Sequence, residues 1–198
     1  MNCLSRRTKW SDMTLGTIKM TARQFLQLGE DPPGVRLELA SGEVVASPSP
    51  IPDHSYVVAA LCHILMQHIE DHDLGQLFMD VDTVFGEFDV RRPDILFFRK
   101  SRLHLIGEKA MEGPPDLAVE VLRPGSVATD RKDKFKLYAA GKVKDYWIVD
   151  PRQRTIEAYR LGRGKYVGGV RGSRTDVVQL PPFKDLKIPL GKLWRPKF

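Results

Sequence analysis

The sequence lacks the features that identify several common protein classes. It has only two cysteines, Cys3 and Cys62, which are too few for a disulfide framework and show no metal-ligand spacing. Its apolar runs, such as Val57–Leu61 and Ile95–Phe98, are far shorter than the roughly 20 residues of a membrane-spanning helix. A glycine-rich phosphate loop and a serine-nucleophile elbow are also missing. These absences argue against a disulfide-stapled secreted domain, an integral membrane protein, a P-loop enzyme and an elbow-type hydrolase.

The N-terminal stretch MNCLSRRTKWSDM has no apolar core behind its charges, so it does not resemble a secretory signal. We therefore expect a cytoplasmic protein with no membrane association. We also expect residues 1–17 to form a flexible tail and residues 18–198 to form one domain, because 198 residues suit a single hydrophobic core.

Charge is distributed unequally along the chain. Residues 1–99 hold nine Lys and Arg against fourteen Asp and Glu, whereas residues 100–198 hold twenty-two against eleven. A basic half can attract a polyanion such as nucleic acid. A solvated basic surface has the same composition, so charge alone leaves both interpretations open.

Three segments have helical patterns. Thr21–Leu28 begins with a capping threonine and ends before the breaker sequence EDPPG. Thr129–Gly141 has Thr129 as a candidate cap and Gly141 as a stop. The segment His54–His72 carries apolar residues at helical spacing, namely Val57, Val58, Leu61, Leu65 and Ile69.

Strand-forming segments fill most of the remaining chain. Residues 35–48 alternate apolar and polar positions on both sides of Ser41-Gly42, which predicts a β-hairpin. Five further runs are rich in β-formers, at residues 76–86, 94–100, 116–122, 143–150 and 154–161, and more short candidates follow Lys165. This order predicts an α/β (α+β) domain with a central mixed sheet, flanking helices, an N-terminal hairpin and additional C-terminal strands.

Two of the predicted strands open with Pro-Asp, and one contains a carboxylate inside its apolar run. RRPDILFF carries Asp94 at its head, and PPDLAVEVL carries Glu120 in its middle. A carboxylate in so apolar a setting has to be paired, hydrogen-bonded or bound to a metal. If Asp94 and Glu120 converge, they suit Mg²⁺, which prefers oxygen ligands, and the Val121 carbonyl could add another. The structural alternatives are salt bridges for these two carboxylates and a turn-forming role for Asp116.

A metal site of this kind also needs an ammonium group, which stabilises transition-state charge or orients a water. Leu122 occupies the position two residues after Glu120, where a lysine is missing. Lys134 in the next predicted helix precedes Leu137 and Tyr138 by three and four residues, so it can share their inward face. The alternative is a snorkelling surface lysine. Two neighbouring lysines would face solvent or DNA phosphates, namely Lys132 and Lys136.

The histidines and aromatic residues are less informative. His54 opens a predicted helix, where it either caps the helix or serves as a general base. Tyr146 and Trp147 are expected in the core rather than as stacking platforms for bases. The other histidines lack the convergent spacing of a zinc site, namely His63, His68, His72 and His104.

Taken together, RRPDILFF, PDLAVEVLRPGS and DRKDKFKLYAAGKVKDYWIVDP resemble the Uma family of putative restriction endonucleases, a branch of the PD-(D/E)xK nuclease superfamily. The similarity runs from about Val35 to Leu161 and includes LELASGEVV and the helix that His54 opens. It implies a restriction-endonuclease-like fold and a metal-dependent endonuclease acting on DNA. We also expect a homodimer.

The resemblance implies a role for each candidate site residue. Asp94, Glu120 and the Val121 carbonyl would bind Mg²⁺ (or Mn²⁺), and the metal would account for the burial of Glu120. Lys134 would replace the missing lysine, and Glu38, which matches an early glutamate of the family, would complete the acidic site.

Two positions depart from the family pattern. The hairpin reads Ser41-Gly42-Glu43 instead of Asp-Gly-Glu, which changes only a turn. Arg123 stands in place of the usual serine, and this extra cation could help to bind phosphate or could hinder a metal. The alternatives to a nuclease are a catalytically inactive homologue that binds DNA or protein, and an oligomeric structural protein.

Overall fold

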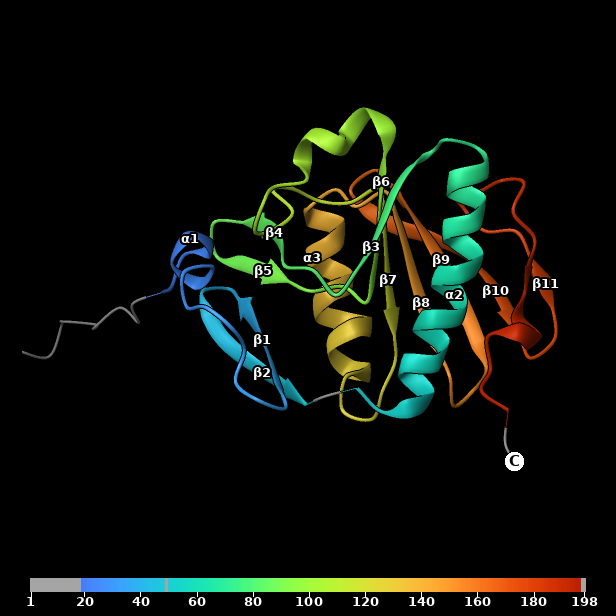
Figure 1. Ribbon diagram of the computed structural model, residues 1–198, viewed down its shortest axis with the longest axis horizontal. Helices are drawn as coiled ribbons and strands as arrows, with labels where there is room; N and C mark the ends of the chain where they lie inside the picture. Colours follow the sequence, from blue (N-terminus) through green and yellow to red (C-terminus); the bar gives the residue numbers. More distant parts are fainter. Residues whose placement is uncertain (1–18, 49, 197–198) are drawn as a thin grey trace, which may run out of the picture.

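The computed structural model describes residues 19–48 and 50–196, and the predicted tail at residues 1–17 lies outside them. A six-stranded sheet forms the centre, in the order β10-β9-β8-β7-β6-β3 (Figure 1). Its strands are β3 (Gly75–Met79), β6 (Ile95–Arg99), β7 (Leu117–Val121), β8 (Asp145–Asp150), β9 (Thr155–Gly162) and β10 (Lys165–Ser173). Strands β7 and β8 are parallel and the other neighbours are antiparallel, so the sheet is mixed as predicted.

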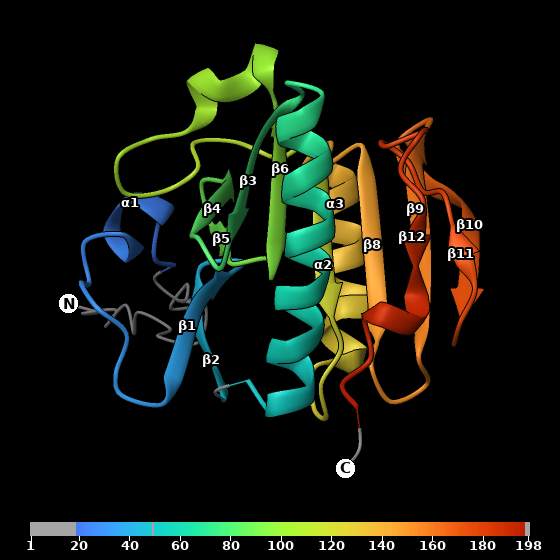
Figure 2. The same cartoon turned by 45° about the vertical axis from the view of Figure 1, so that its right-hand side comes forward.

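Two helices cover opposite faces of this sheet (Figure 2). Helix α2 (Pro52–Asp71) packs its apolar stripe against alternate residues of β7, including Leu117 and Val119. Helix α3 (Phe135–Ala140) lies on the other face, where Tyr138 packs with Ala118. Alternate side chains of β7 thus belong to two hydrophobic clusters on opposite faces of the sheet, as its sequence predicts.

The C-terminal segment completes the layer that contains α2. It forms a two-stranded sheet, β11 (Val177–Val178) with β12 (Ile188–Pro189), and then a short 3₁₀ turn, Leu190–Lys192. The segment contributes several apolar side chains to the core beneath α2, namely Val178, Leu180, Phe183, Ile188, Leu190, Leu193 and Trp194.

A second antiparallel sheet, in the order β2-β1-β5-β4, holds the predicted hairpin. It is built from β1 (Val35–Ala40), β2 (Glu43–Pro48), β4 (Thr83–Gly86) and β5 (Asp89–Arg91). The hairpin turns at Ser41 and Gly42, whose φ values are 51° and 87°. Two successive positive φ angles match the twist of a tight hairpin, so this prediction is confirmed. Helix α1 (Ala22–Phe25) packs on this sheet.

The three predicted helices exist with altered ends. Thr21 caps α1 through a reciprocal capping box with Gln24, but α1 is only four residues long. The prediction that Thr129 caps a helix is wrong, because the Asp130 amide already donates to the Ser126 carbonyl at 2.9 Å. A π-helical stretch, η3 (Thr129–Lys134), leads directly into α3, and Gly141 is the C-cap as expected.

Two strand predictions need correction. The run predicted over residues 76–86 is split between β3 and β4, which belong to different sheets. The chain reverses near Asp80, whose φ is 56°. Strand β5 was not predicted, because three residues are too few to show an alternating pattern. Among the described residues, none of the helices is long and apolar enough to cross a membrane.

Candidate active site

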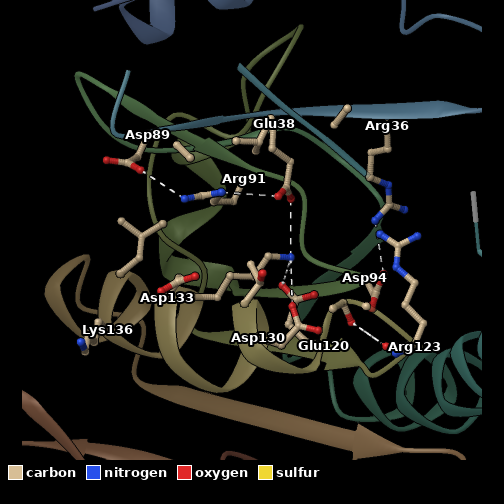
Figure 3. A pocket seen from close by; sticks show the side chains of 18 of the residues that line it. Arg36, Glu38, Asp89, Arg91, Asp94, Glu120, Arg123, Asp130, Asp133 and Lys136 are labelled. Carbon is tan, nitrogen blue, oxygen red and sulfur yellow. Dashed lines mark hydrogen bonds and ion pairs between the residues drawn. The ribbon is translucent and has the colours of Figure 1, made fainter. Parts of the chain in front are cut away.

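A pocket of about 690 Å³ lies between the small sheet and the helical segment that contains η3 and α3 (Figure 3). Charged side chains of both signs reach it from β1, β5, the head of β6, the end of β7 and the helical segment. Loop 123–126, which follows β7, forms part of the wall and includes Arg123. The pocket therefore collects the candidate residues from segments far apart in the sequence.

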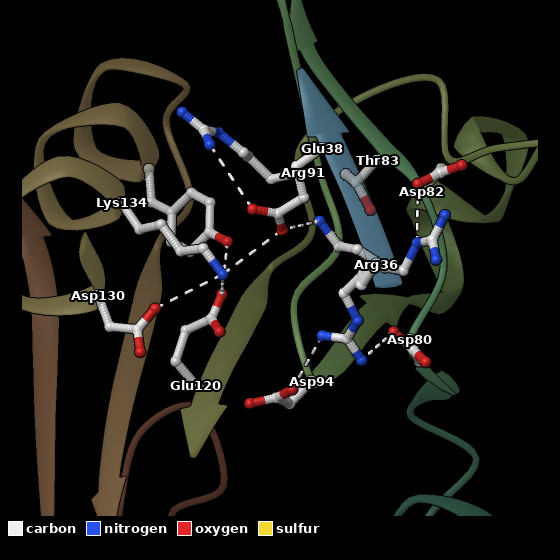
Figure 4. A network of polar contacts seen from close by, with 12 residues as sticks. Arg36, Glu38, Asp80, Asp82, Thr83, Arg91, Asp94, Glu120, Asp130 and Lys134 are labelled. Atoms are coloured by element: carbon white, nitrogen blue, oxygen red, sulfur yellow. Dashed lines mark hydrogen bonds and ion pairs between the residues drawn. The ribbon is translucent and has the colours of Figure 1, made fainter. Parts of the chain in front are cut away.

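Lys134 lies at the centre of the polar network (Figure 4). Its Nζ is 3.0 Å from Glu120 Oε1, 3.5 Å from Glu38 Oε1 and 3.5 Å from Asp130 Oδ1. The side chain is only 6% exposed, so Lys134 is not a snorkelling surface lysine. The Tyr138 hydroxyl, one helical turn further on, donates to the same Glu120 oxygen at 2.6 Å.

Asp94 is held next to Glu120 by strand pairing. Ile95 pairs with Val119 across the antiparallel strands β6 and β7. Asp94, which precedes Ile95, therefore lies opposite Glu120, which follows Val119. Asp94 Oδ2 accepts the Val121 amide at 2.8 Å. The Pro-Asp residue and the buried glutamate therefore meet at one edge of the central sheet.

A histidine and an arginine also contact Asp94. His54 Nε2 lies 3.1 Å from Asp94 Oδ2, and Arg36 Nη1 lies 3.4 Å from Asp94 Oδ1. The capping interpretation of His54 is wrong, because Ile51 is the N-cap of α2 and makes no side-chain cap. Arg36 also forms an ion pair with Asp80.

Glu38 comes from the small sheet. Its Oε1 accepts the Arg92 amide at 2.9 Å, and its Oε2 lies 3.6 Å from Arg91 Nη1. Arg36 and Glu38 are two residues apart on β1, so both side chains point to the pocket side of the strand. The hairpin thus supplies one cation and one carboxylate to the site.

The buried carboxyls differ in their ease of ionisation. Burial raises the pKa of Glu120 well above its usual range, and the charges of Asp130 and Asp94 add to this effect while Lys134 opposes it. Burial also disfavours the charged form of Asp94, but contacts with His54, Lys134 and the Val121 amide outweigh it and lower the pKa of Asp94. The site therefore holds a carboxyl whose ionisation its neighbours favour, Asp94, beside one whose ionisation burial opposes, Glu120.

Lys134 keeps its charge despite its burial. Desolvation opposes the ammonium form, but the surrounding carboxylates of Glu120, Glu38 and Asp130 outweigh it and raise the pKa of Lys134. The same neighbours act on Glu38, whose pKa is lowered because Lys134 and the Arg92 amide overcome the cost of burial. The cluster is thus a charged network with one central cation.

Protein groups account for the buried carboxylates in this structure. Glu120 is satisfied by Lys134 and Tyr138, so its burial does not require a metal. Over residues 19–48 and 50–196, no three His, Cys, Asp or Glu side chains are arranged to hold a metal ion. The donor types nevertheless fit Mg²⁺, because Asp94, Glu120 and the Val121 carbonyl offer only oxygen.

Comparison with known proteins gives the family. A family model named Uma2 and described as "Putative restriction endonuclease" matches residues 22–191. The chain belongs to the Uma2 family. This membership supports a nuclease. None of the curated proteins compared matches the chain.

A solved structure confirms the fold of this Uma2 chain. It is described as a putative nuclease belonging to DUF820 from Anabaena variabilis ATCC 29413. It is 21% identical in sequence, covers 88% of this chain and 97% of its own, and superposes with a TM-score of 0.73. The restriction-endonuclease-like fold predicted for the chain is thereby confirmed.

Four residues of this Uma2 site were not predicted from the sequence. Tyr138 was read only as an apolar marker of the inward helix face, although its hydroxyl bonds Glu120. Asp130 precedes Lys134 by four residues, a spacing that could have indicated their contact. The other two are arginines of the small sheet, Arg36 and Arg91, whose approach depends on tertiary packing.

Several weaker candidates lie away from the site. Asp116 is fully buried at the opposite end of β7, where its carboxylate accepts the Arg99 amide at 3.0 Å and lies 3.4 Å from Arg102 Nη1. Asp116 is therefore a buried partner of two arginines in addition to any role in the turn. Tyr146 and Trp147 are core residues, as expected.

Proposed function

We propose that the chain is a metal-dependent endonuclease that hydrolyses phosphodiester bonds of DNA. The observation that carries this proposal is the convergence of two strand carboxylates, Asp94 and Glu120, with the buried ammonium of Lys134 beside a pocket. Membership of the Uma2 family supports the same reaction class.

Asp94, Glu120 and the Val121 carbonyl would hold Mg²⁺ (or Mn²⁺). When bound, such an ion polarises a phosphate and lowers the pKa of a coordinated water. Asp94 suits this role because its partners favour the carboxylate form. Glu120 would bind the ion in its ionised form, which burial opposes, and would share its Oε1 between the ion and its contacts with Lys134 and Tyr138.

Lys134 would stabilise the negative charge that develops on the phosphate. A fixed ammonium in a site shielded from water is suited to this, because no reorganisation is needed at the moment of reaction. Glu38 and Asp130 act as positioning residues, since each lies 3.5 Å from Lys134 Nζ and helps to keep it charged.

A second candidate function is a catalytically inactive module that binds DNA. The observation in its favour is that both oxygens of Asp94 are already engaged, by Arg36 on one side and by His54 and the Val121 amide on the other. In this alternative Arg36 would replace the metal as the counter-ion of Asp94. The predicted DNA partner is common to both functions, and the homodimer stays a prediction.

Plasmid nicking separates the two functions. The wild type should nick supercoiled plasmid in the presence of Mg²⁺ or Mn²⁺ and lose this activity with a chelator. Asp94→Asn should reduce the rate by on the order of a hundredfold or more, because it removes an anionic ligand of the metal that would polarise the phosphate. Lys109→Ala, which alters an exposed lysine that does not line the pocket, should remain close to the wild type. A wild type that binds plasmid without nicking it would favour the inactive module.

A further inference from the structure

A second pocket, of about 620 Å³, lies outside the site described above. It is formed by the turn between β8 and β9, the loop after β10 and the C-terminal segment. We call it the arginine groove, since its lining includes Arg152, Arg154, Arg174 and Arg195.

The guanidinium groups of the arginine groove have few acidic partners. Arg152, Arg154 and Arg174 are exposed, and none of the carboxylates within the described ranges forms an ion pair with them. Arg195 contacts Asp53 at 2.6 Å. Asp150 is nearby, but its Oδ1 accepts two backbone amides of the turn. Like charges gathered without counter-ions attract an anion, and guanidinium forks match phosphate geometry.

Hydrogen bonds fix the walls of the arginine groove to one another. The Arg174 amide donates to the Arg154 carbonyl at 2.7 Å. The indole N–H of the buried Trp194 donates to the Arg174 carbonyl at 2.6 Å. Arg154 and Arg174 both have left-handed backbones, with φ of 54° and 50°. Ser173 pairs with Thr155 across β9 and β10, so Arg154 and Arg174, the next residues along, lie at the same end of these strands.

The arginine groove lies close to the proposed active site. Asp53 and His54 are consecutive residues at the start of α2, and the first contacts Arg195 while the second contacts Asp94. Strands β7 and β8 are parallel and in register, so the turn after β8 lies at the same sheet edge as loop 123–126. Figure 2 shows the C-terminal segment beside the start of α2.

We infer that the arginine groove binds backbone phosphates of the DNA whose cleavage is proposed above, and this inference rests on that proposed function. Trp194 is buried and engaged in a hydrogen bond, so the described residues that line the groove offer cations and no exposed ring on which a base could stack. The contact is therefore independent of base sequence and positions the duplex, with one end of α2 between the groove and the cleavage site.

Salt-dependent binding of duplex DNA tests the inference. We would measure fluorescence anisotropy of a labelled duplex with the full chain in chelator, between about 50 and 200 mM salt, a range over which phosphate contacts alter affinity strongly. The variant is Arg152→Ala/Arg174→Ala. The control, Arg163→Ala/Lys165→Ala, removes the same charge at the opposite end of β9 and β10, and Arg163 has a matching φ of 49°.

The arginine variant should bind roughly tenfold or more weakly, since each lost contact is a charge-assisted hydrogen bond. Its slope of log affinity against log salt should fall by about 1.8, or about 0.9 for each phosphate contact. The control should keep nearly the wild-type slope. In plasmid nicking the variant should raise KM and leave kcat unchanged, because these arginines touch no reacting group.

Three results would overturn the inference. Equal loss in both variants would mean that net charge alone is responsible. If the arginine variant kept the wild-type affinity for DNA while Asp94→Asn still abolished nicking, the groove would not be a DNA contact. The proposed nuclease function would be unaffected by that result. If the arginine variant lost only the binding of a polyglutamate probe of matched charge, the groove would be a site for an acidic protein segment.

Discussion

Replacement of Lys134 by methionine tests whether its ammonium holds the buried carboxylates together. The substitution keeps the length and apolar stem of the side chain but removes the charge. Lys134 Nζ has three carboxylate neighbours between 3.0 and 3.5 Å. Each contact is worth about 5 kcal/mol at an effective dielectric constant of about 20, and desolvation of the ions offsets much of the sum. We expect Lys134→Met to lower the free energy of unfolding by about 3–5 kcal/mol at pH 8.

The loss should shrink as the pH falls from 8 to 5. Without Lys134 the pKa values of the buried carboxyls would rise, and those of Glu120 and Asp130 are already raised, so the variant gains stability as these groups take up protons. The wild-type lysine stays charged over this range, because its pKa is raised. Urea unfolding at both pH values measures the difference, with Lys132→Met as the exposed control, expected within about 0.5 kcal/mol of the wild type. A loss below about 1 kcal/mol at pH 8, or one that does not depend on pH, would refute the reasoning.

Two other predictions concern residues next to the site. Tyr138→Phe should cost about 1–3 kcal/mol of stability, because Glu120 loses a buried donor while the ring keeps its stacking on Phe85; wild-type stability in urea unfolding would mean that this hydrogen bond contributes nothing. Burial in α2 raises the pKa of the Cys62 thiol to about 12, so at pH 8 only about one molecule in 10⁴ carries the thiolate. Mass-spectrometric mapping after alkylation should find Cys62 modified in urea and unmodified in the native protein; rapid native labelling would contradict its burial.

Local patterns were sufficient for most elements of the fold. The hairpin at residues 35–48 and the helix predicted over His54–His72 follow from turn chemistry and helical periodicity, and both are present. The prediction of one strand over residues 76–86 is wrong, because β-propensity does not show which sheet a strand joins. The predicted helix start at Thr129 is wrong because the helical backbone already begins at residues 127–128, and a threonine in the first turn of a helix has the same local pattern as one that caps it.

Local sequence patterns also predicted part of the candidate site. Asp94, Glu120 and Lys134 each stand out within their own segments, and the structure brings them together. Arg36 and Glu38 lie more than fifty residues from their partners Asp94 and Arg92, so no local pattern indicates these contacts, and the sequence analysis includes Glu38 only through the family resemblance. The hydrogen bond from Tyr138 to Glu120 could not be predicted, because a tyrosine on the inward face of a helix fits an apolar pattern equally well.

Metal binding at Asp94 and Glu120 is the most direct test of the proposed function. We would titrate Mn²⁺ into the wild type and Asp94→Ala/Glu120→Gln by calorimetry, since glutamine keeps an oxygen that accepts from Lys134 and Tyr138. The proposal predicts that the wild type binds Mn²⁺ and nicks plasmid, and that the variant remains folded but does neither. If both proteins stay folded and neither binds Mn²⁺, the buried carboxylates are structural and the proposal of a metal-dependent nuclease is wrong.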